Sequence, residues 1–479
     1  MSNQGNLQTE PYSLLPHQAA LIEQFFADPS KQGYLLQSDV GLDSLHTTAH
    51  IIKRLMEMQP DARILLLVPK MLQAATSHVL ARVGVLAEVV DRFRYRELQD
   101  AALSGGAIWR TGGVFILSMD FGKQDDIASS LAGVQWTMLI VPEAHTLRGL
   151  RKQVVQRIAD SSPDLRIILV TTIGADDVPT FGIGPFVTIH WRRSQIVDNS
   201  GQRLFIQISP RLEIIKYQKS AIEQRIQEAV TEIAELLRAN NNVGSLLGAF
   251  FTRSLSSSPA ALEEGLRRLR TRLTEGISES VLPVGEEDEE TDTENLPFIN
   301  PANREDLIAA LDKCLAELEA LSIDSKLNGF IKAFQALQSN QPSLSLVCIF
   351  TESRATLFYL QTQLEEMGLT QHVLHGSMSF DDRRRNVDEF KRHGDVLLST
   401  SAVAEGLNLS QVELLVLYDS PRSMLGLRKL YGRFNRLGRT KPLLIQILVE
   451  DLTGNSGKND ILSNLLELLA EDNNDAQAR

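Results

Sequence analysis

Residues 34–58 read YLLQSDVGLDSLHTTAHIIKRLMEM, an apolar run followed by a polar turn and then a helical segment. A strand, a turn and a helix in this order form the setting in which a loop cradles phosphate at a helix N-terminus. Such a loop needs glycine for close backbone approach, a lysine for the β- and γ-phosphates and a hydroxyl for Mg²⁺. Gly41 is present, but Asp43, Ser44 and Leu45 stand where Gly-Lys-Thr is expected.

A loop of this type normally carries a lysine next to this position, whereas Asp43 has a negatively charged side chain. Two unit charges about 4 Å apart interact by roughly 4 kcal/mol at an effective dielectric near 20, so Asp43 would repel a triphosphate. A second interpretation assigns Asp43 a structural role as the N-cap of the following helix.

Outward from this segment, short apolar runs alternate with helical segments from about residue 14 to 191 and again from about 327 to 451. The predicted strands are 34–36, 64–68, 114–118, 137–141, 167–170 and 186–190, then 345–350, 372–375, 395–399, 414–418 and 443–448. Strands separated by helices predict two doubly wound parallel sheets, an α/β fold. Between them, residues 217–238, 260–273 and 304–321 have the apolar spacing of amphipathic helices.

The composition excludes several classes of protein. The 479 residues carry 48 Lys+Arg and 60 Asp+Glu, a net charge of -12, which weighs against a non-specific polyanion binder. Seven of the acids lie in residues 286–294, which predicts a solvated loop or, alternatively, an acidic docking segment. Two cysteines exclude a disulfide scaffold, and the nine histidines have no metal-ligand spacing, so no metal site is predicted. With no signal peptide and no apolar run of 18 residues, we expect a cytoplasmic protein without membrane partners.

A series of short motifs extends along nearly the whole chain. They are LLPHQ (14–18), DVGL (39–42), LVPK (67–70), ILS (116–118), IVPEAH (140–145), LVTTI (169–173), DSKL (324–327), CIFTE (348–352), HGSM (375–378), TSAVAEGLNL (400–409), YDSP (418–421) and LYGRFNRLGR (430–439). This ordered set resembles the motifs of superfamily two helicase-like ATPases of the Swi/Snf type, in particular the bacterial RNA-polymerase-recycling branch.

The resemblance implies two RecA-like lobes with a helical insertion between them. The expected domains are an N-terminal lobe with a degenerate nucleotide site (1–200), a helical insertion containing the acidic loop (201–325), a C-terminal lobe (326–455) and a helix with a polar tail (456–479).

The resemblance also assigns roles to individual positions. Nucleotide contacts fall on Gln18, Gly41, Asp43, Ser44, Leu45 and Gly406. Catalytic positions are Glu143, Arg433 and Arg436, whereas Pro142 replaces the aspartate that holds Mg²⁺. Nucleic-acid contacts fall on Lys70, Ser118, Thr351, Ser353 and Thr400.

Structural explanations exist for several of these residues. Glu143 and His145 would form a polar network at a strand end, and the two arginines would pair with Asp419 or Glu405, or act in trans on a partner ATPase. The basic clusters at 148–152, 192–193, 267–272, 383–385 and 422–441 are either solvated helix faces or DNA contacts.

Because the loop lysine, the Mg²⁺-binding hydroxyl and the metal-holding carboxylate are all replaced, we expect ATP hydrolysis to be absent or marginal. The leading hypothesis is a catalytically degenerate pseudoenzyme, a DNA-binding or scaffold subunit that contacts the duplex DNA backbone and other proteins, such as an intact ATPase or nuclease. No cofactor is predicted for it. The alternatives are an active ATP-dependent DNA translocase or helicase that uses ATP and Mg²⁺ at a divergent site, and a protein–protein interaction module.

Overall fold

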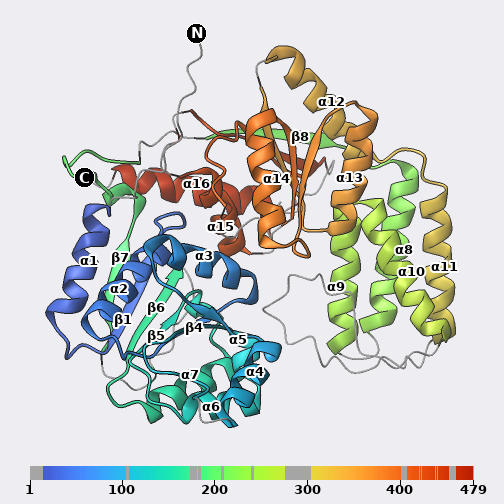
Figure 1. Cartoon of the computed structure of the whole chain (residues 1–479). Coiled ribbons are helices and arrows are strands. Elements are labelled where there is room, and N and C mark those ends of the chain that lie inside the picture. Colours follow the sequence, from blue (N-terminus) through green and yellow to red (C-terminus); the bar gives the residue numbers. More distant parts are fainter. Residues whose placement is uncertain are drawn as a thin grey trace. The chain divides into compact units, whose positions relative to one another are not determined.

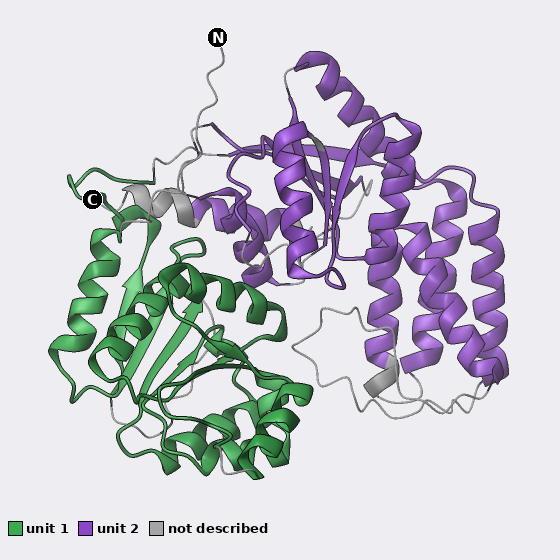
Figure 2. Ribbon diagram, viewed as in Figure 1, with its two compact units in different colours: residues 1–206 green, residues 207–479 purple. Residues whose placement is uncertain are grey.

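The structure is a computed structural model that describes residues 14–103, 107–172, 181, 185–205, 210–238, 242–275, 304–342, 344–400, 407–419, 421, 423–436, 439, 441–451 and 460–477. The chain divides into two compact units, residues 1–206 (unit 1) and 207–479 (unit 2), each of which is built around its own parallel sheet (Figure 2).

Unit 1 contains a seven-stranded sheet in the order β3-β4-β2-β5-β6-β1-β7, in which every neighbouring pair is parallel (Figure 1). Its strands are β1 (Gly33–Ser38), β2 (Ile64–Val68), β3 (Glu88–Val89), β4 (Val114–Ser118), β5 (Met138–Val141), β6 (Arg166–Thr172) and β7 (Val187–Trp191). The six strands predicted for this region are confirmed, and only the two-residue edge strand β3 was not predicted.

Helices cover both faces of this sheet because alternate strand residues point to opposite sides. Along β2, Ile64, Leu66 and Val68 join one apolar core, whereas Leu65 and Leu67 join the other. The first core includes α1 (Pro16–Ala27), α2 (Ser44–Met58) and α3 (Gln73–Val83). The second includes α4 (Arg92–Leu103), α5 (Met119–Gly122), α6 (Asp125–Ala132) and α7 (Gly149–Ser161).

Unit 2 contains a six-stranded parallel sheet in the order β10-β11-β9-β12-β13-β8. Its strands are β8 (Arg211–Tyr217), β9 (Leu346–Phe350), β10 (Gln371–Leu374), β11 (Asp395–Ser399), β12 (Leu414–Leu417) and β13 (Leu444–Glu450). Within the expected helical insertion or linker (201–325), residues 211–217 form the strand β8, which pairs with β13 along its full length.

Among the described residues of unit 2, five helices pack on the two faces of the second sheet. Phe330 and Phe334 of α12 (Ser325–Asn340) pack with α13 (Arg354–Glu366) in one core. The core on the opposite face includes α14 (Phe380–His393), α15 (Met424–Phe434) and α16 (Asp460–Gln477).

Four further helices of unit 2 pack together as a bundle around their own apolar core. They are α8 (Ala221–Arg238), α9 (Asn242–Ser257), α10 (Pro259–Glu275) and α11 (Arg304–Glu319), and Figure 1 shows them side by side. We call these four helices the bundle. Three of them match predicted helices, whereas α9 was not predicted, and α8 begins at Ala221 because the residues before it form β8. Across the described residues, no helix is both long and apolar enough to cross a membrane.

Candidate functional site

The turn between β1 and α2 is the position at which a phosphate-binding loop is expected. Gly41 has φ of 94°, and Asp43, at the N-cap position of α2, has φ of 50° and ψ of 43°. The Asp43 carbonyl accepts a hydrogen bond from the Thr47 N–H at 3.2 Å, but its side chain makes no capping hydrogen bond. Asp43 is therefore the N-cap residue of α2, as the second interpretation expected, but its backbone is left-handed instead of extended and its side chain makes no capping hydrogen bond.

Arg193 holds this turn in place. Its backbone N–H donates to Asp39 Oδ2 at 2.8 Å, and its guanidinium Nη2 donates to the Val40 carbonyl at 2.9 Å. Behind the turn, the Ser38 and Ser44 hydroxyl oxygens lie 3.4 Å apart. Ser44 is the first residue of α2, and its hydroxyl lies beside that of Ser38. Neither side chain supplies a charge to the loop.

The end of β5 carries the second set of expected catalytic residues. Pro142 is buried, and Glu143 has a left-handed backbone with φ of 54°. His145 Nδ1 lies 3.5 Å from Glu143 Oε2 and 3.1 Å from Thr171 Oγ1, a hydroxyl on β6. Since β6 lies between β5 and β1, these two strands end roughly 10 Å apart at the same carboxyl edge of the sheet, and the turns that carry Glu143 and Asp43 follow them.

These residues do not fit a magnesium nucleotide. Asp43 is exposed, Leu45 has no oxygen to offer, and Pro142 cannot act as a metal ligand. The N–H groups at the start of α2 still form the positive end of a helix, but an exposed carboxylate stands beside them. Within the described residues, no group of three or more His, Cys, Asp or Glu side chains is arranged to hold a metal ion.

The expected adenine contact, Gln18, is buried in α1, and its Oε1 accepts a hydrogen bond from the Leu15 N–H at 3.0 Å. This acceptor is therefore used inside the protein. The preceding residue, His17, packs edge-on against Trp191 with ring centroids 4.7 Å apart. Burial lowers the pKa of His17 to about 4.

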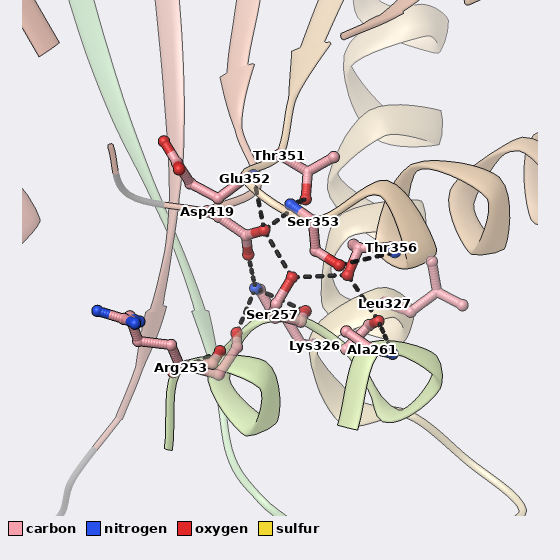
Figure 3. Close-up of polar contacts among 12 residues, drawn as sticks. Arg253, Ser257, Ala261, Lys326, Leu327, Thr351, Glu352, Ser353, Thr356 and Asp419 are labelled. Atoms are coloured by element: carbon pink, nitrogen blue, oxygen red, sulfur yellow. Dashed lines mark hydrogen bonds and ion pairs between the residues drawn. The ribbon is translucent and has the colours of Figure 1, made fainter. Parts of the chain in front are cut away.

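In unit 2, a buried polar cluster lies beyond the carboxyl ends of β9 and β12 (Figure 3). The Asp419 carboxylate accepts hydrogen bonds from Lys326 Nζ at 2.9 Å, from Ser257 Oγ at 2.6 Å and from the Thr351 hydroxyl. The Glu352 N–H also donates to this carboxylate, at 3.2 Å.

This cluster corrects one prediction and bears on another. Asp419 pairs with Lys326 and not with either expected arginine. Thr351 is fully buried with its hydroxyl on Asp419, which leaves it no surface to offer a nucleic acid. The role of Lys326 was not predicted from the sequence, because its contact with Asp419 joins residues far apart in the chain.

The two expected catalytic arginines are half-buried at the end of α15. Arg433 lies in the last turn, and Arg436 lies two residues beyond the helix. Burial, together with the positive charge of Arg436, lowers the pKa of Lys391 on α14. The expected nucleotide contact Gly406 and the expected acid Glu405 lie outside the described residues.

The remaining expected nucleic-acid contacts are scattered over both units. Lys70 is exposed at the start of a 3-10 turn (Lys70–Leu72), whereas Ser118 is buried and caps α5 through the Phe121 N–H at 3.1 Å. Ser353 caps α13, and Thr400 is buried.

Many arginines of the basic clusters have acidic neighbours. The ion pairs include Arg151–Asp120, Arg267–Glu263, Arg268–Glu264, Arg270–Asp312, Arg385–Asp382 and Lys441–Glu413. Such surface pairs contribute little to stability, but each one lowers the net positive field that a phosphate backbone would meet.

Comparison with known proteins relates this architecture to helicases. The family model of the helicase conserved C-terminal domain matches residues 329–441. YqhH of Bacillus subtilis, described as an uncharacterized ATP-dependent helicase, is 22% identical over 475 residues, which cover 96% of this chain and 78% of that protein.

Two other proteins resemble this chain, one over a short segment of its sequence and one over most of its fold. Protein CHROMATIN REMODELING 19 of Arabidopsis thaliana is 33% identical over 122 residues, 25% of this chain and 16% of its own. The helicase domain of Pyrococcus furiosus Hef superposes with a TM-score of 0.52 at 14% identity, over 94% of this chain and 99% of that one. The chain is therefore similar to helicases in two respects: residues 329–441 match their conserved C-terminal domain, and its fold is that of a helicase structure with two RecA-like lobes.

Proposed function

We propose that this protein is a helicase-like pseudoenzyme of the Swi/Snf type, which does not hydrolyse ATP and works as a subunit of a larger complex. The observation that carries the proposal is the turn before α2, where an exposed Asp43 precedes Ser44 and Leu45 in place of the lysine and hydroxyl that a triphosphate requires. Phosphoryl transfer depends almost entirely on positioning of the phosphates and neutralisation of their charge. A loop without the lysine and the hydroxyl supplies neither.

The end of β5 supports the same proposal. A carboxylate that holds Mg²⁺ is absent where Pro142 stands, while Glu143 lies within 3.5 Å of His145. An arginine finger is worth about 10³–10⁵ in rate only when a nucleotide and its metal are in place to receive it. Arg433 and Arg436 therefore cannot compensate for the missing groups.

Phosphate release from ATP, with and without duplex DNA, tests this proposal. We expect turnover below about 1 s⁻¹, the low end of ordinary enzyme rates, in both conditions. The matched control combines Asp43→Gly, Ser44→Lys, Leu45→Thr and Pro142→Asp. DNA-stimulated turnover of the unmodified chain at or above that rate would instead establish an active ATP-dependent translocase or helicase; the Bacillus relative is named an ATP-dependent helicase.

The partners are part of the proposal. We propose that the subunit contacts the duplex DNA backbone through exposed cations such as Lys70, and that it assembles with other proteins. Binding to a duplex DNA fragment should weaken steeply with added salt, because each phosphate contact releases counterions. No binding at about 50 mM salt would leave a protein–protein interaction module as the function.

A further inference from the structure

The second sheet has a switch point between β9 and β12. From β9 the chain builds β10 and β11 on one side, and then β12 and β13 on the other. In open α/β sheets, ligands bind in the crevice outside the carboxyl ends of the strands at such a point. Here the crevice is bordered by Thr351, directly after β9, and by Asp419, two residues after β12.

The turn that joins α9 to α10 occupies this crevice, although it comes from the bundle and lies about 100 residues earlier in the sequence than Thr356. Ser257 Oγ lies 2.6 Å from Thr356 Oγ1 and donates to Asp419, and Ser258 Oγ lies 2.7 Å from the same threonine. Lys326 Nζ donates to the carbonyls of Ser256 and Ser257 at 2.6 and 3.0 Å.

The side chains in this junction are almost fully withdrawn from water. The exposed fraction is 10% for the Lys326 side chain and 8% for Asp419. Lys326 Nζ also lies 4.1 Å from the ring centroid of Tyr418, which adds a cation–π contact. A buried charge of this kind requires its partner, because removal of one member leaves the other uncompensated.

We propose that the α9–α10 turn is a built-in ligand of the switch-point crevice, and that it locks the bundle onto the second sheet. Asp419 accepts a hydrogen bond from Ser257 in the turn and another from Thr351 at the end of β9, and Lys326 ties the carbonyls of the turn to Asp419 (Figure 3). The bundle and the sheet therefore separate only when this junction opens. This inference does not depend on whether the protein hydrolyses ATP.

Hydrogen exchange by the full chain tests the lock at two segments, residues 256–262 and 351–357. Among their amides, the Ala261 N–H donates to Ser258 Oγ and the Glu352 N–H to Asp419. We expect Lys326→Met to accelerate exchange in both segments by about 100-fold or more, because one buried charge loses its partner. The control, Lys332→Met, changes an exposed lysine on the same helix and should leave both segments within about threefold of wild type.

Two further variants separate the lock from general damage. Adding Asp419→Asn to Lys326→Met should slow exchange relative to Lys326→Met alone, because the orphan charge is gone. If Lys326→Met does not fold, Thr356→Val serves instead and should accelerate exchange in both segments by about tenfold, the effect of a lost buried hydrogen bond. Either of two results would overturn the proposal. In the first, residues 256–262 of the variant used exchange within threefold of the control. In the second, the double variant exchanges as fast as Lys326→Met.

Discussion

His17 is expected to make the stability of unit 1 depend on pH. Its ring packs on Trp191, and neither ring nitrogen has a hydrogen-bond partner within the described residues. Burial lowers its pKa from 6.5 to about 4, since the charged imidazolium would lose its hydration in this apolar site. The native protein therefore keeps His17 neutral at pH values where the unfolded chain protonates it.

The sign and the size of the effect follow from this difference in pKa. The unfolded state binds one more proton than the native state between pH 6.5 and 4. The contribution of neutral His17 to the free energy of unfolding is therefore fully present above pH 6.5 and is lost as the pH falls towards 4. The difference in the pKa of His17 between the two states corresponds to a loss of at most about 3 kcal/mol in the free energy of unfolding. Because the ring is only about half-buried, solvent screening reduces the expected loss to about 2 kcal/mol.

Urea unfolding followed by tryptophan fluorescence measures this loss, because all three tryptophans lie in unit 1. The free energy of unfolding of wild type should fall by about 2 kcal/mol more than that of His17→Phe between pH 6.5 and 4. The control is His190→Phe, which changes an exposed histidine on β7 and should follow wild type. If His17→Phe loses as much stability as wild type over this range, burial of a neutral His17 is not the cause.

Backbone geometry leads to two further predictions. Gly112→Ala should destabilise unit 1 by more than Gly84→Ala does, as measured by urea unfolding. Both glycines have positive φ, but only at Gly112 would the new Cβ clash with a backbone atom, because it would lie 2.4 Å from the carbonyl oxygen of Pro60. Asp43→Gly should be more stable than Asp43→Ala by about 1 kcal/mol in the same measurement, because the left-handed backbone disfavours alanine, and equal stability would contradict that geometry.

The strands that the sequence predicts best are those buried on both faces. β2 and β4 have the predicted bounds because their five residues are all apolar or small and all buried. β8 was missed because most of its residues are exposed at an edge, where a mixed pattern such as Arg211–Tyr217 does not distinguish a strand from the start of a helix. Its place in the sheet depends on β13, more than 200 residues away.

Some features of the candidate site can also be predicted from the sequence, whereas others depend on the folded structure. The proposed replacements at Ser44, Leu45 and Pro142 rest on the sequence alone, where the surrounding motifs predict their positions. The left-handed conformation of Asp43 cannot be predicted in this way, since aspartate is common at extended N-caps as well. The pairing of Asp419 with Lys326 depends on tertiary packing, which no local pattern encodes.

The central claim is that the turn before α2 no longer holds a nucleotide, and calorimetric titration of ATP with Mg²⁺ into the full chain tests it most directly. We predict no saturable binding with a dissociation constant tighter than about 1 mM, which corresponds to about 4 kcal/mol. A dissociation constant in the micromolar range that depends on Mg²⁺ would contradict the claim.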